Sequence, residues 1–295
     1  MPATTQQITA KFLTFVQRGR EILTQRAGLL PQVESFERFV EAAKPLLLPR
    51  LRSSLPILIQ RAKCVHRWLM DKDVLAVAGL SNQENSYTKL VAWMLAPQTH
   101  LRTAIRRQKA WLQILGIAER IDLSSLESPR MQLRTDDGIP DLILEFPEDI
   151  LVVEVKTKSV EHTTPSGAAQ TLAYSGSVLR RLGRKATPHV VFLTADGQLP
   201  ENPAAIPTTF MAFVLALATE IAPEELPSDL RWIFSTIFTH LLTHTGPAGV
   251  DVRSLLAQVV QWESDATVLD DSTILMSRLR SIQQAMKILI PEARP

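Results

Sequence analysis

Apolar residues recur every three or four positions along the first part of the chain, which predicts helices within residues 7–70. Prolines interrupt this stretch, so we expect several short helices in place of one long helix. The same spacing predicts helices over residues 84–96 and 100–115. The buried side of the second of these helices is expected to consist of Leu101, Ala104, Ile105, Leu112 and Leu115.

The pattern changes to short aliphatic and β-branched runs in the middle of the chain. Residues 141–146 and 150–156 have the composition of strands, and the turn between them begins at Pro147. A helix over 168–182 and a third strand over 188–194 are predicted next. The segments beyond that strand have mainly helical spacing: 208–221, 228–245 and 251–290.

This order of elements predicts an α/β protein in which a small core is embedded in helices. We expect an N-terminal helical region at 1–75, a core at 76–220 and a C-terminal helical region at 221–295. Hydrophobic residues make up 45% of the 295 residues and charged residues 21%, which permits a sizeable core and excludes global disorder.

Charge and cysteine content narrow the class of protein further. Residues 1–70 hold 11 Lys/Arg and 4 Asp/Glu, a net charge of +7, whereas residues 196–295 hold 6 and 12, a net charge of −6. This asymmetry indicates an anionic partner, although a solvated helical face is the simpler explanation of charge alone. The single cysteine, Cys64, excludes an intramolecular disulfide framework and a cysteine-rich zinc site. No signal-peptide core and no long apolar run is present, so we expect a cytoplasmic protein without a membrane partner.

The candidate chemistry lies on the two central strands. If residues 147–148 form a two-residue loop, Asp141 lies directly opposite Glu154, with Cβ atoms about 4.5–5.5 Å apart. Strand alternation places Lys156 on the same face, while Val155 points into the core. The alternative is a surface hairpin whose charges form a solvated ion pair. If only the spacing of Asp141, Glu154 and Lys156 is considered, this alternative is favoured over a functional site.

Two carboxylates this close repel each other unless a cation compensates for their charge. A hard ion such as Mg²⁺ binds carboxylate oxygens, and a neighbouring lysine can orient or deprotonate a water. Glu84 opens a predicted helix and offers a third carboxylate, although an acid is also favoured there by the helix dipole. Gln170 and Tyr174 share one helix face after the strand pair and can contact a phosphate or brace a metal site. Asp136 and Asp137 are competing ligands.

Taken in order, Glu84, Asp141, Glu154-Val155-Lys156 and Gln170-Thr-Leu-Ala-Tyr174 resemble the motifs of the PD-(D/E)xK nuclease superfamily. The last element resembles its RecB-like branch, and residues 84–95 and 190–197 resemble a bacterial group of these nucleases. The resemblance covers residues 81–215 and implies a restriction-endonuclease-like fold, with a mixed central sheet flanked by helices.

The resemblance also implies roles for these residues and an activity. The implied metal ligands are Asp141, Glu154, Glu84 and the carbonyl of Val155. Lys156 would position or activate the water, and Gln170 and Tyr174 match the downstream pair of the family. The implied reaction is hydrolysis of DNA phosphodiester bonds with Mg²⁺ or Mn²⁺, in restriction or anti-phage defence. A homodimer or a partner defence subunit is the protein partner that such a setting implies.

Two basic groups are candidate phosphate contacts if the nuclease interpretation holds. The first comprises Arg102, Arg106, Arg107 and Lys109, and the second comprises Arg180, Arg181, Arg184 and Lys185. The alternative for both groups is solvation of exposed helix ends. We expect the arginines of both groups to flank the cleft that holds Lys156.

Other functions remain as alternatives to a nuclease. A nuclease-like fold can bind nucleic acid without cutting it, and a nuclease subunit can stay silent until a partner or a signal arrives. No Gly-rich phosphate loop is present, which argues against an ATP-driven activity. His240 and His244 have the i,i+4 spacing of metal ligands, but they lack the Glu of the H-E-x-x-H pattern, and a partly buried or capping role is the preferred interpretation.

Overall fold

A computed structural model describes residue 49 and residues 51–80, 84–123, 128–157, 161–164, 167–246, 249–264 and 272–290. The expected helices before residue 49 lie outside the described residues. The described chain divides into two compact units, each considered by itself: residues 63–256 form one, and residues 51–62 with 257–290 form the other. No helix among the described residues is long and apolar enough to cross a membrane.

The smaller unit is helical. It contains the first part of a helix over residues 51–66 and the helix α10 (Ser272–Leu289). The guanidinium Nη1 of Arg61 donates a hydrogen bond of 2.5 Å to the backbone oxygen of Leu289, at the C-terminal end of α10. Carbonyls at a helix end have no partner within the helix, so this arginine satisfies one of them.

The larger unit is built on a mixed five-stranded sheet with the order β1-β2-β3-β4-β5. The first three strands are antiparallel, and the last three are parallel. The protein is therefore an α/β protein with a mixed sheet flanked by helices, as the order of elements predicts. The strands are β1 (Arg130–Met131), β2 (Leu142–Glu145), β3 (Asp149–Lys156), β4 (Thr187–Thr194) and β5 (Ile206–Thr209).

The predicted register of the central hairpin is confirmed. Leu142 pairs with Val153 and Glu145 with Ile150, and the amide of Phe146 donates to the Asp149 oxygen at 2.9 Å across a two-residue loop. Continuing this pairing by one residue beyond Leu142 places Asp141 opposite Glu154. Both faces of β3 are buried, because helices cover both sides of the sheet.

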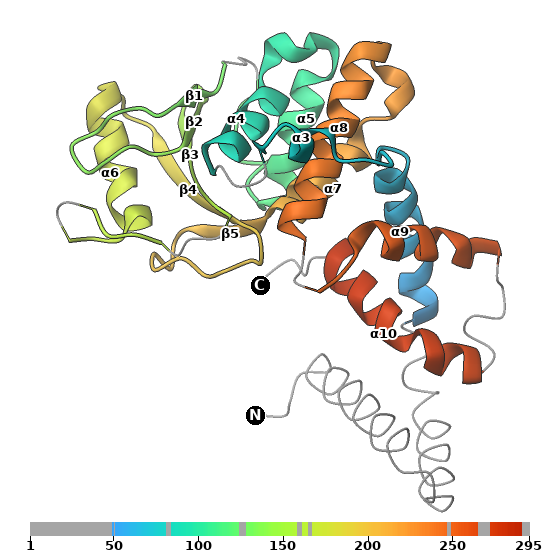
Figure 1. The fold of residues 1–295 in the computed structure, drawn as a ribbon. Coiled ribbons are helices and arrows are strands. Elements are labelled where there is room, and N and C mark those ends of the chain that lie inside the picture. The colour runs from blue at the N-terminus through green and yellow to red at the C-terminus, as the bar shows by residue number, and fades with distance from the viewer. Residues whose placement is uncertain are drawn as a thin grey trace, which may run out of the picture. The chain divides into compact units, whose positions relative to one another are not determined.

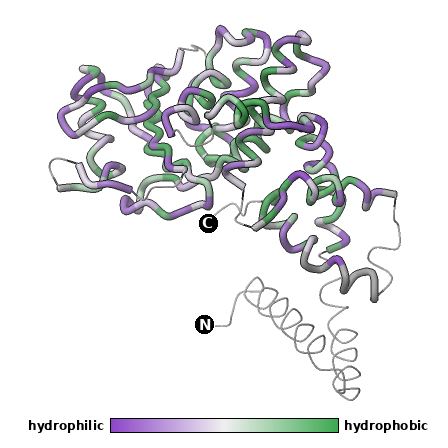
Figure 2. The backbone as a smooth tube through the Cα atoms, in the orientation of Figure 1, coloured by the Kyte–Doolittle hydropathy of each residue, from purple (hydrophilic) through white to green (hydrophobic). Residues whose placement is uncertain are grey.

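Helix α6 (Gln170–Leu182) covers one face of the sheet, and α4 (Glu84–Leu95), α5 (Leu101–Ile114) and α7 (Phe210–Glu220) lie on the other side (Figure 1). Tyr174 and Val178 of α6 pack on Ile143, Ile150 and Val152, which belong to the same face as Glu154. The central strands β2 and β3 and the second half of β4 are mainly hydrophobic (Figure 2). Charged residues on this sheet are therefore exceptions that need an explanation.

The chain beyond the sheet is helical over the described residues, as predicted. It includes α8 (Ser228–Thr245), with α9 (Val252–Gln261) after it. Residues 208–209, which were expected at the start of a helix, form the end of β5 instead. Parallel pairing with β4 outweighs the local preference, and the edge position of β5 tolerates Pro207.

The expected buried side of α5 is wrong in part. Leu101 is 72% exposed and Ile105 is 51% exposed, whereas the polar residues Arg107 and Gln108 are buried. The amide Nε2 of Gln108 donates to the Leu95 oxygen at 2.9 Å, at the end of α4, where helix carbonyls lack internal partners. Helix α5 is thus oriented by capping bonds to α4 as well as by burial of its apolar residues.

Candidate metal and catalytic site

Three acids and one lysine meet where β3 ends. Glu154 and Lys156 project from β3, Asp141 directly precedes β2, and Glu84 is the first residue of α4. The lysine Nζ lies 2.5 Å from Glu154 Oε1. Asp141 belongs to the same hairpin as Glu154 and Lys156, whereas Glu84 comes from a distant part of the chain and is brought to this strand end by the fold.

Backbone amides of β3 and of the residue after it hold the two other acids in place. The Val155 amide donates to Asp141 Oδ2 at 2.8 Å, and the Thr157 amide donates to Glu84 Oε1 at 3.0 Å. Each acid is therefore fixed against the end of β3 by a charge-assisted hydrogen bond. Val155, whose carbonyl is expected to be a further ligand, lies between Glu154 and Lys156 on β3.

Burial excludes the alternative of a solvated surface ion pair. Glu154 is 1% exposed and Lys156 is 6% exposed. Oxygen Oε2 of Glu154 accepts no hydrogen bond from the residues that the structure describes, and the carboxyl group of Asp141 lies within hydrogen-bonding reach of Glu154. A buried carboxylate oxygen without a partner carries a desolvation cost, which a cation or a proton would relieve.

The pKa values of the residues in the cluster reflect this desolvation cost. Burial, together with repulsion from Asp141, raises the pKa of Glu154 to about 8. Burial also raises the pKa of Asp141, despite the hydrogen bond from Val155 and the attraction of Lys156. The pKa of Lys156 is raised, because attraction to the carboxylates outweighs its own burial. The site therefore favours positive charge, from the lysine and from any additional cation.

Gln170 and Tyr174 lie next to this cluster on α6. The Gln170 amide Nε2 donates to the Tyr174 hydroxyl at 2.9 Å, and the Gln170 Oε1 accepts a bond of 3.3 Å from the amide of His162. Burial raises the pKa of Tyr174, and the charges of Glu154 and Asp141 raise it further. The phenol thus remains protonated and presents an O–H group beside the acids.

Comparison of the chain with protein-family models, with curated proteins and with solved structures gave no significant match. The assignment of this site therefore depends on its geometry and on the order of its motifs.

The competing acids at the preceding turn have other surroundings. Asp136 is exposed, and Asp137 forms an ion pair of 3.2 Å with Nη2 of Arg180. Gly138, the next residue, has a φ of +132°, and a Cβ placed there would lie 3.2 Å from the Tyr174 hydroxyl. This turn therefore shapes the site through Gly138, a contact that the turn sequence does not reveal.

Glu161 is a second residue that sequence reasoning missed. One of its carboxylate oxygens accepts bonds from the amide and the hydroxyl of Thr171, and the other accepts a bond of 2.8 Å from the amide of Glu201. The carboxylate thus fixes the start of α6, where Gln170 lies, and an acid near a helix start is favourable. No local motif marks Glu161, because its partners follow it by 10 and 40 residues.

The phosphate-contact role expected for Arg107 is wrong. Arg107 is 0% exposed, and its Nη2 donates to the Ala96 oxygen at 3.0 Å and to the His100 oxygen at 3.2 Å. Its guanidinium also lies 5.6 Å from the ring centre of Phe234, within the range of a cation–π contact. Burial lowers the pKa of Arg107 and keeps the side chain away from any nucleic acid.

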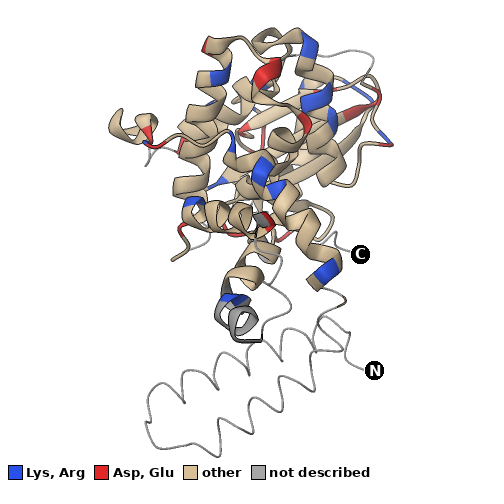
Figure 3. Ribbon diagram, turned by 90° about the vertical axis from the view of Figure 1, so that its right-hand side faces the viewer, with Lys and Arg blue, Asp and Glu red and all other residues tan. Residues whose placement is uncertain are grey.

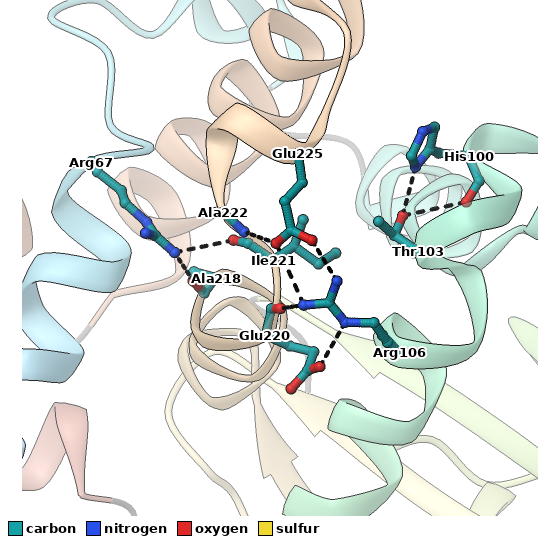
Figure 4. Close-up of polar contacts among 9 residues, drawn as sticks. All are labelled: Arg67, His100, Thr103, Arg106, Ala218, Glu220, Ile221, Ala222 and Glu225. Atoms are coloured by element: carbon teal, nitrogen blue, oxygen red, sulfur yellow. Dashed lines mark hydrogen bonds and ion pairs between the residues drawn. The ribbon is translucent and has the colours of Figure 1, made fainter.

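Arg106 is engaged by two acids of the same unit (Figure 4). Its Nε lies 2.9 Å from Glu220 Oε1 and its Nη1 lies 2.5 Å from Glu225 Oε2. A further bond from Nη2 reaches the backbone oxygen of Glu220, at the end of α7. Arg106 therefore joins α5 to the segment after α7, and its expected role as a phosphate contact is not supported by these bonds.

Arg184 holds the hairpin turn and does not flank the cleft. Its Nη1 donates to Glu145 Oε2 at 3.0 Å, and its Nη2 donates to the oxygens of Phe146 and Pro147 at 2.7 and 2.8 Å. These groups lie at the opposite end of β3 from Lys156, about 23 Å away for seven strand steps. The expectation that Arg184 lines the cleft is therefore wrong.

The other expected basic residues are exposed. Arg180 pairs with Asp137, and the remaining four are Arg102, Lys109, Arg181 and Lys185. Basic and acidic residues are interspersed over the described helices and strands (Figure 3). The exposed members of the two groups remain candidates for contacts with an anionic partner.

Proposed function

We propose that this chain is a metal-dependent nuclease of the PD-(D/E)xK type, which hydrolyses phosphodiester bonds of DNA with Mg²⁺ or Mn²⁺. The observation that carries the proposal is the buried cluster at the end of β3, in which Glu154 keeps an unpartnered carboxylate oxygen beside Asp141 and Lys156. The mixed sheet with helices on both faces supports a restriction-endonuclease-like fold for the core.

The donor set fits a hard divalent cation. Such ions prefer carboxylate and carbonyl oxygens, and the three acids supply carboxylates from three different elements. Asp141, Glu154 and Glu84 would hold the ion, with the Val155 carbonyl as a further oxygen. A bound ion would neutralise the phosphate charge and lower the pKa of a coordinated water.

The protein's own residues supply the remaining functions. An ammonium group has three N–H donors, so Lys156 can keep its bond to Glu154 and still donate to a water or a phosphate oxygen. Tyr174 offers its protonated hydroxyl, and Gln170 holds that hydroxyl in position. Helix α6 and the buried strand end limit the access of bulk water, which strengthens each of these interactions.

Cleavage assays with matched variants test the proposal. Linear, circular and single-stranded DNA, and RNA as a comparison, would be incubated with Mg²⁺, Mn²⁺ or EDTA. We expect metal-dependent cleavage of DNA by the parent chain, which EDTA abolishes. Lys156→Met should lose cleavage, whereas Lys89→Met, which changes an exposed lysine outside both candidate basic groups, should retain it.

The outcomes separate this proposal from its alternatives. Binding of DNA without cleavage under any metal condition would favour a silent nuclease-like binding subunit. Cleavage that persists in both Lys156→Met and Glu154→Gln would refute the assignment of this cluster as the active site. A restriction or anti-phage setting would be supported by protection of cells against phage that depends on Lys156.

A further inference from the structure

A second cluster of metal-ligating side chains lies in the same unit, outside the carboxylate site. Asp73 directly precedes the short helix α3 (Val74–Val77), and His240 and His244 lie one turn apart on α8. The aspartate is 167 residues away from His240 in sequence. Sequence spacing indicated the histidine pair, but it gave no indication of the third member.

The side chains are in direct contact. His240 Nδ1 lies 3.0 Å from each oxygen of Asp73, and His244 Nε2 lies 2.8 Å from Asp73 Oδ2. Each of the three residues offers one ligand atom, and these three atoms all lie within 4.8 Å of one another. The imidazole rings of the two histidines have centroids 4.7 Å apart.

The surroundings hold these groups in place, and the side chains of Asp73 and His244 are partly exposed. His240 is completely buried and its ring stacks on Tyr87 with centroids 5.4 Å apart. Burial raises the pKa of the Tyr87 phenol, and the Asp73 charge raises it further. Asp73 Oδ1 accepts a bond of 3.0 Å from the Ala76 amide, which fixes the carboxylate. The side chain of His244 is 27% exposed and gives an ion access to the cluster.

We propose that Asp73, His240 and His244 form a second metal site, which takes a borderline divalent cation of the Zn²⁺ class. One carboxylate and two imidazoles are the donor types that Zn²⁺ accepts, and three protein ligands leave a position open to water or another ligand. This set differs from the all-oxygen set at the end of β3, so the two sites should differ in metal preference.

The geometry needs only a small adjustment to bind such an ion. Zinc bonds of about 2.0–2.2 Å in a tetrahedron place ligand atoms about 3.3–3.6 Å apart. The observed separations of 2.8 and 3.0 Å must therefore widen by about 0.3–0.8 Å, and the two imidazole nitrogens, which lie within 4.8 Å of each other, must take a separation in the same range. Rotation of the part-exposed His244 side chain can supply this change. In the absence of an ion, hydrogen bonds from the two imidazoles to Asp73 occupy the same positions.

A bound ion would join the segment before α3 to α8. Because an ion that binds only the folded chain adds its binding free energy to stability, the site would act as a clamp between these two segments. At a Zn²⁺ concentration 100 times the dissociation constant, the ratio of folded to unfolded protein should rise about 100-fold. The open ligand position would also let the site bind a further small ligand.

The test is a Zn²⁺ titration of the full chain, followed by calorimetry and thermal unfolding, with Co²⁺ as a spectroscopic probe. Glu154→Gln serves as the background, because it weakens the carboxylate site and isolates the second one. In that background we expect one equivalent of Zn²⁺ to bind, with a rise in melting temperature and a visible Co²⁺ spectrum of tetrahedral type. His244→Gln and Asp73→Asn should each lose the equivalent, the temperature shift and the spectrum.

His66→Gln is the matched control, since it changes a histidine of the same unit outside the cluster and should retain all three signals. Asp73→Asn keeps an oxygen for the Ala76 amide, so it remains informative if His244→Gln fails to fold. Equal Zn²⁺ uptake by the Glu154→Gln background protein and by His244→Gln and Asp73→Asn made in that background would overturn the proposal. So would the absence of any zinc-dependent stabilisation of the parent, which would identify the cluster as a hydrogen-bond network.

Discussion

Lys156 and Glu154 form a buried ion pair with a separation of 2.5 Å, and both side chains come from the same face of one strand. A buried pair of this kind gains Coulomb energy but loses the hydration of two charges, so it seldom stabilises a fold strongly. The second oxygen of Glu154 has no partner among the described residues. An arrangement that is costly to stability and left incomplete is typical of a site adapted to bind or react.

The first prediction concerns the pH dependence of stability without metal. The pKa of Glu154 is raised to about 8, from the ordinary value of 4.5. Between these values the folded chain holds a proton that the unfolded chain has released, so unfolding becomes easier as the pH rises. This contribution to stability is complete below the ordinary pKa and is lost as the pH passes the raised one.

Glu154→Gln mimics the protonated carboxyl group and should remove that part of the pH dependence. In denaturant titrations we expect the variant to exceed the parent in free energy of unfolding above about pH 8, by on the order of a few kcal/mol. Mg²⁺ should reverse the trend in the parent, because a cation favours the ionised carboxylate. Equal slopes against pH in parent and variant would show that Glu154 titrates normally.

The second prediction concerns the role of Lys156. Lys156→Met keeps an unbranched apolar stem in the buried position but removes the ammonium, so metal binding should persist while cleavage falls. Loss of a positioned acid–base group typically costs about 10²–10⁴-fold in rate. Single-turnover cleavage would measure the rate, and calorimetry with Mn²⁺ would measure binding. Loss of metal binding together with activity would instead identify the lysine as necessary for assembly of the cluster.

Gly138 provides the third prediction. Its φ of +132° is unfavourable for any residue with a Cβ, and the added carbon would lie 3.2 Å from the Tyr174 hydroxyl. Gly138→Ala should therefore destabilise the fold by about 1–3 kcal/mol and displace the phenol from the site. Gly79→Ala is the control, because Gly79 also has a positive φ but has no atom within 4 Å of the added carbon. Cleavage should fall in the first variant only.

The part of the fold that could be predicted depends on short-range signals. Pro147 marks the turn, and the alternation of side chains on a strand then determines that Asp141 faces Glu154. Helices α4 and α6 are also predicted by a short-range signal, because their apolar residues recur at helical spacing. Glu84, the first residue of α4, accepts a hydrogen bond from the amide of Thr157 just after β3, and Gln170, the first residue of α6, donates to the hydroxyl of Tyr174.

The remainder depends on partners that are distant in sequence. A charged residue such as Arg107 is usually exposed on a helix. Arg107 is buried instead, because its guanidinium donates hydrogen bonds to the carbonyls of Ala96 and His100. Arg184 is similar, since its partners belong to a turn 37 to 39 residues earlier. Charge on a helix therefore did not distinguish residues that bind an external anion from residues that satisfy the chain's own oxygens.

The fourth prediction uses two neighbouring basic residues to separate these roles. Arg184 donates to Glu145 and to two carbonyls of the hairpin turn, whereas Lys185 is exposed. Arg184→Gln should lower the free energy of unfolding by roughly 1.5–3 kcal/mol, because it removes hydrogen bonds made by a charged donor. Lys185→Gln should stay within about 0.5 kcal/mol of the parent. Urea titrations would measure both values.

The same pair distinguishes fold support from binding of nucleic acid. Removing one basic side chain that binds a phosphate of duplex DNA lowers the salt slope of binding by about 0.9. Arg184→Gln should leave this slope unchanged in fluorescence anisotropy titrations at several salt concentrations, since its guanidinium is already occupied by the hairpin. A lower slope in Lys185→Gln would show that the exposed end of α6 binds DNA. A lower slope in Arg184→Gln, at unchanged stability, would contradict the structural role assigned to that arginine.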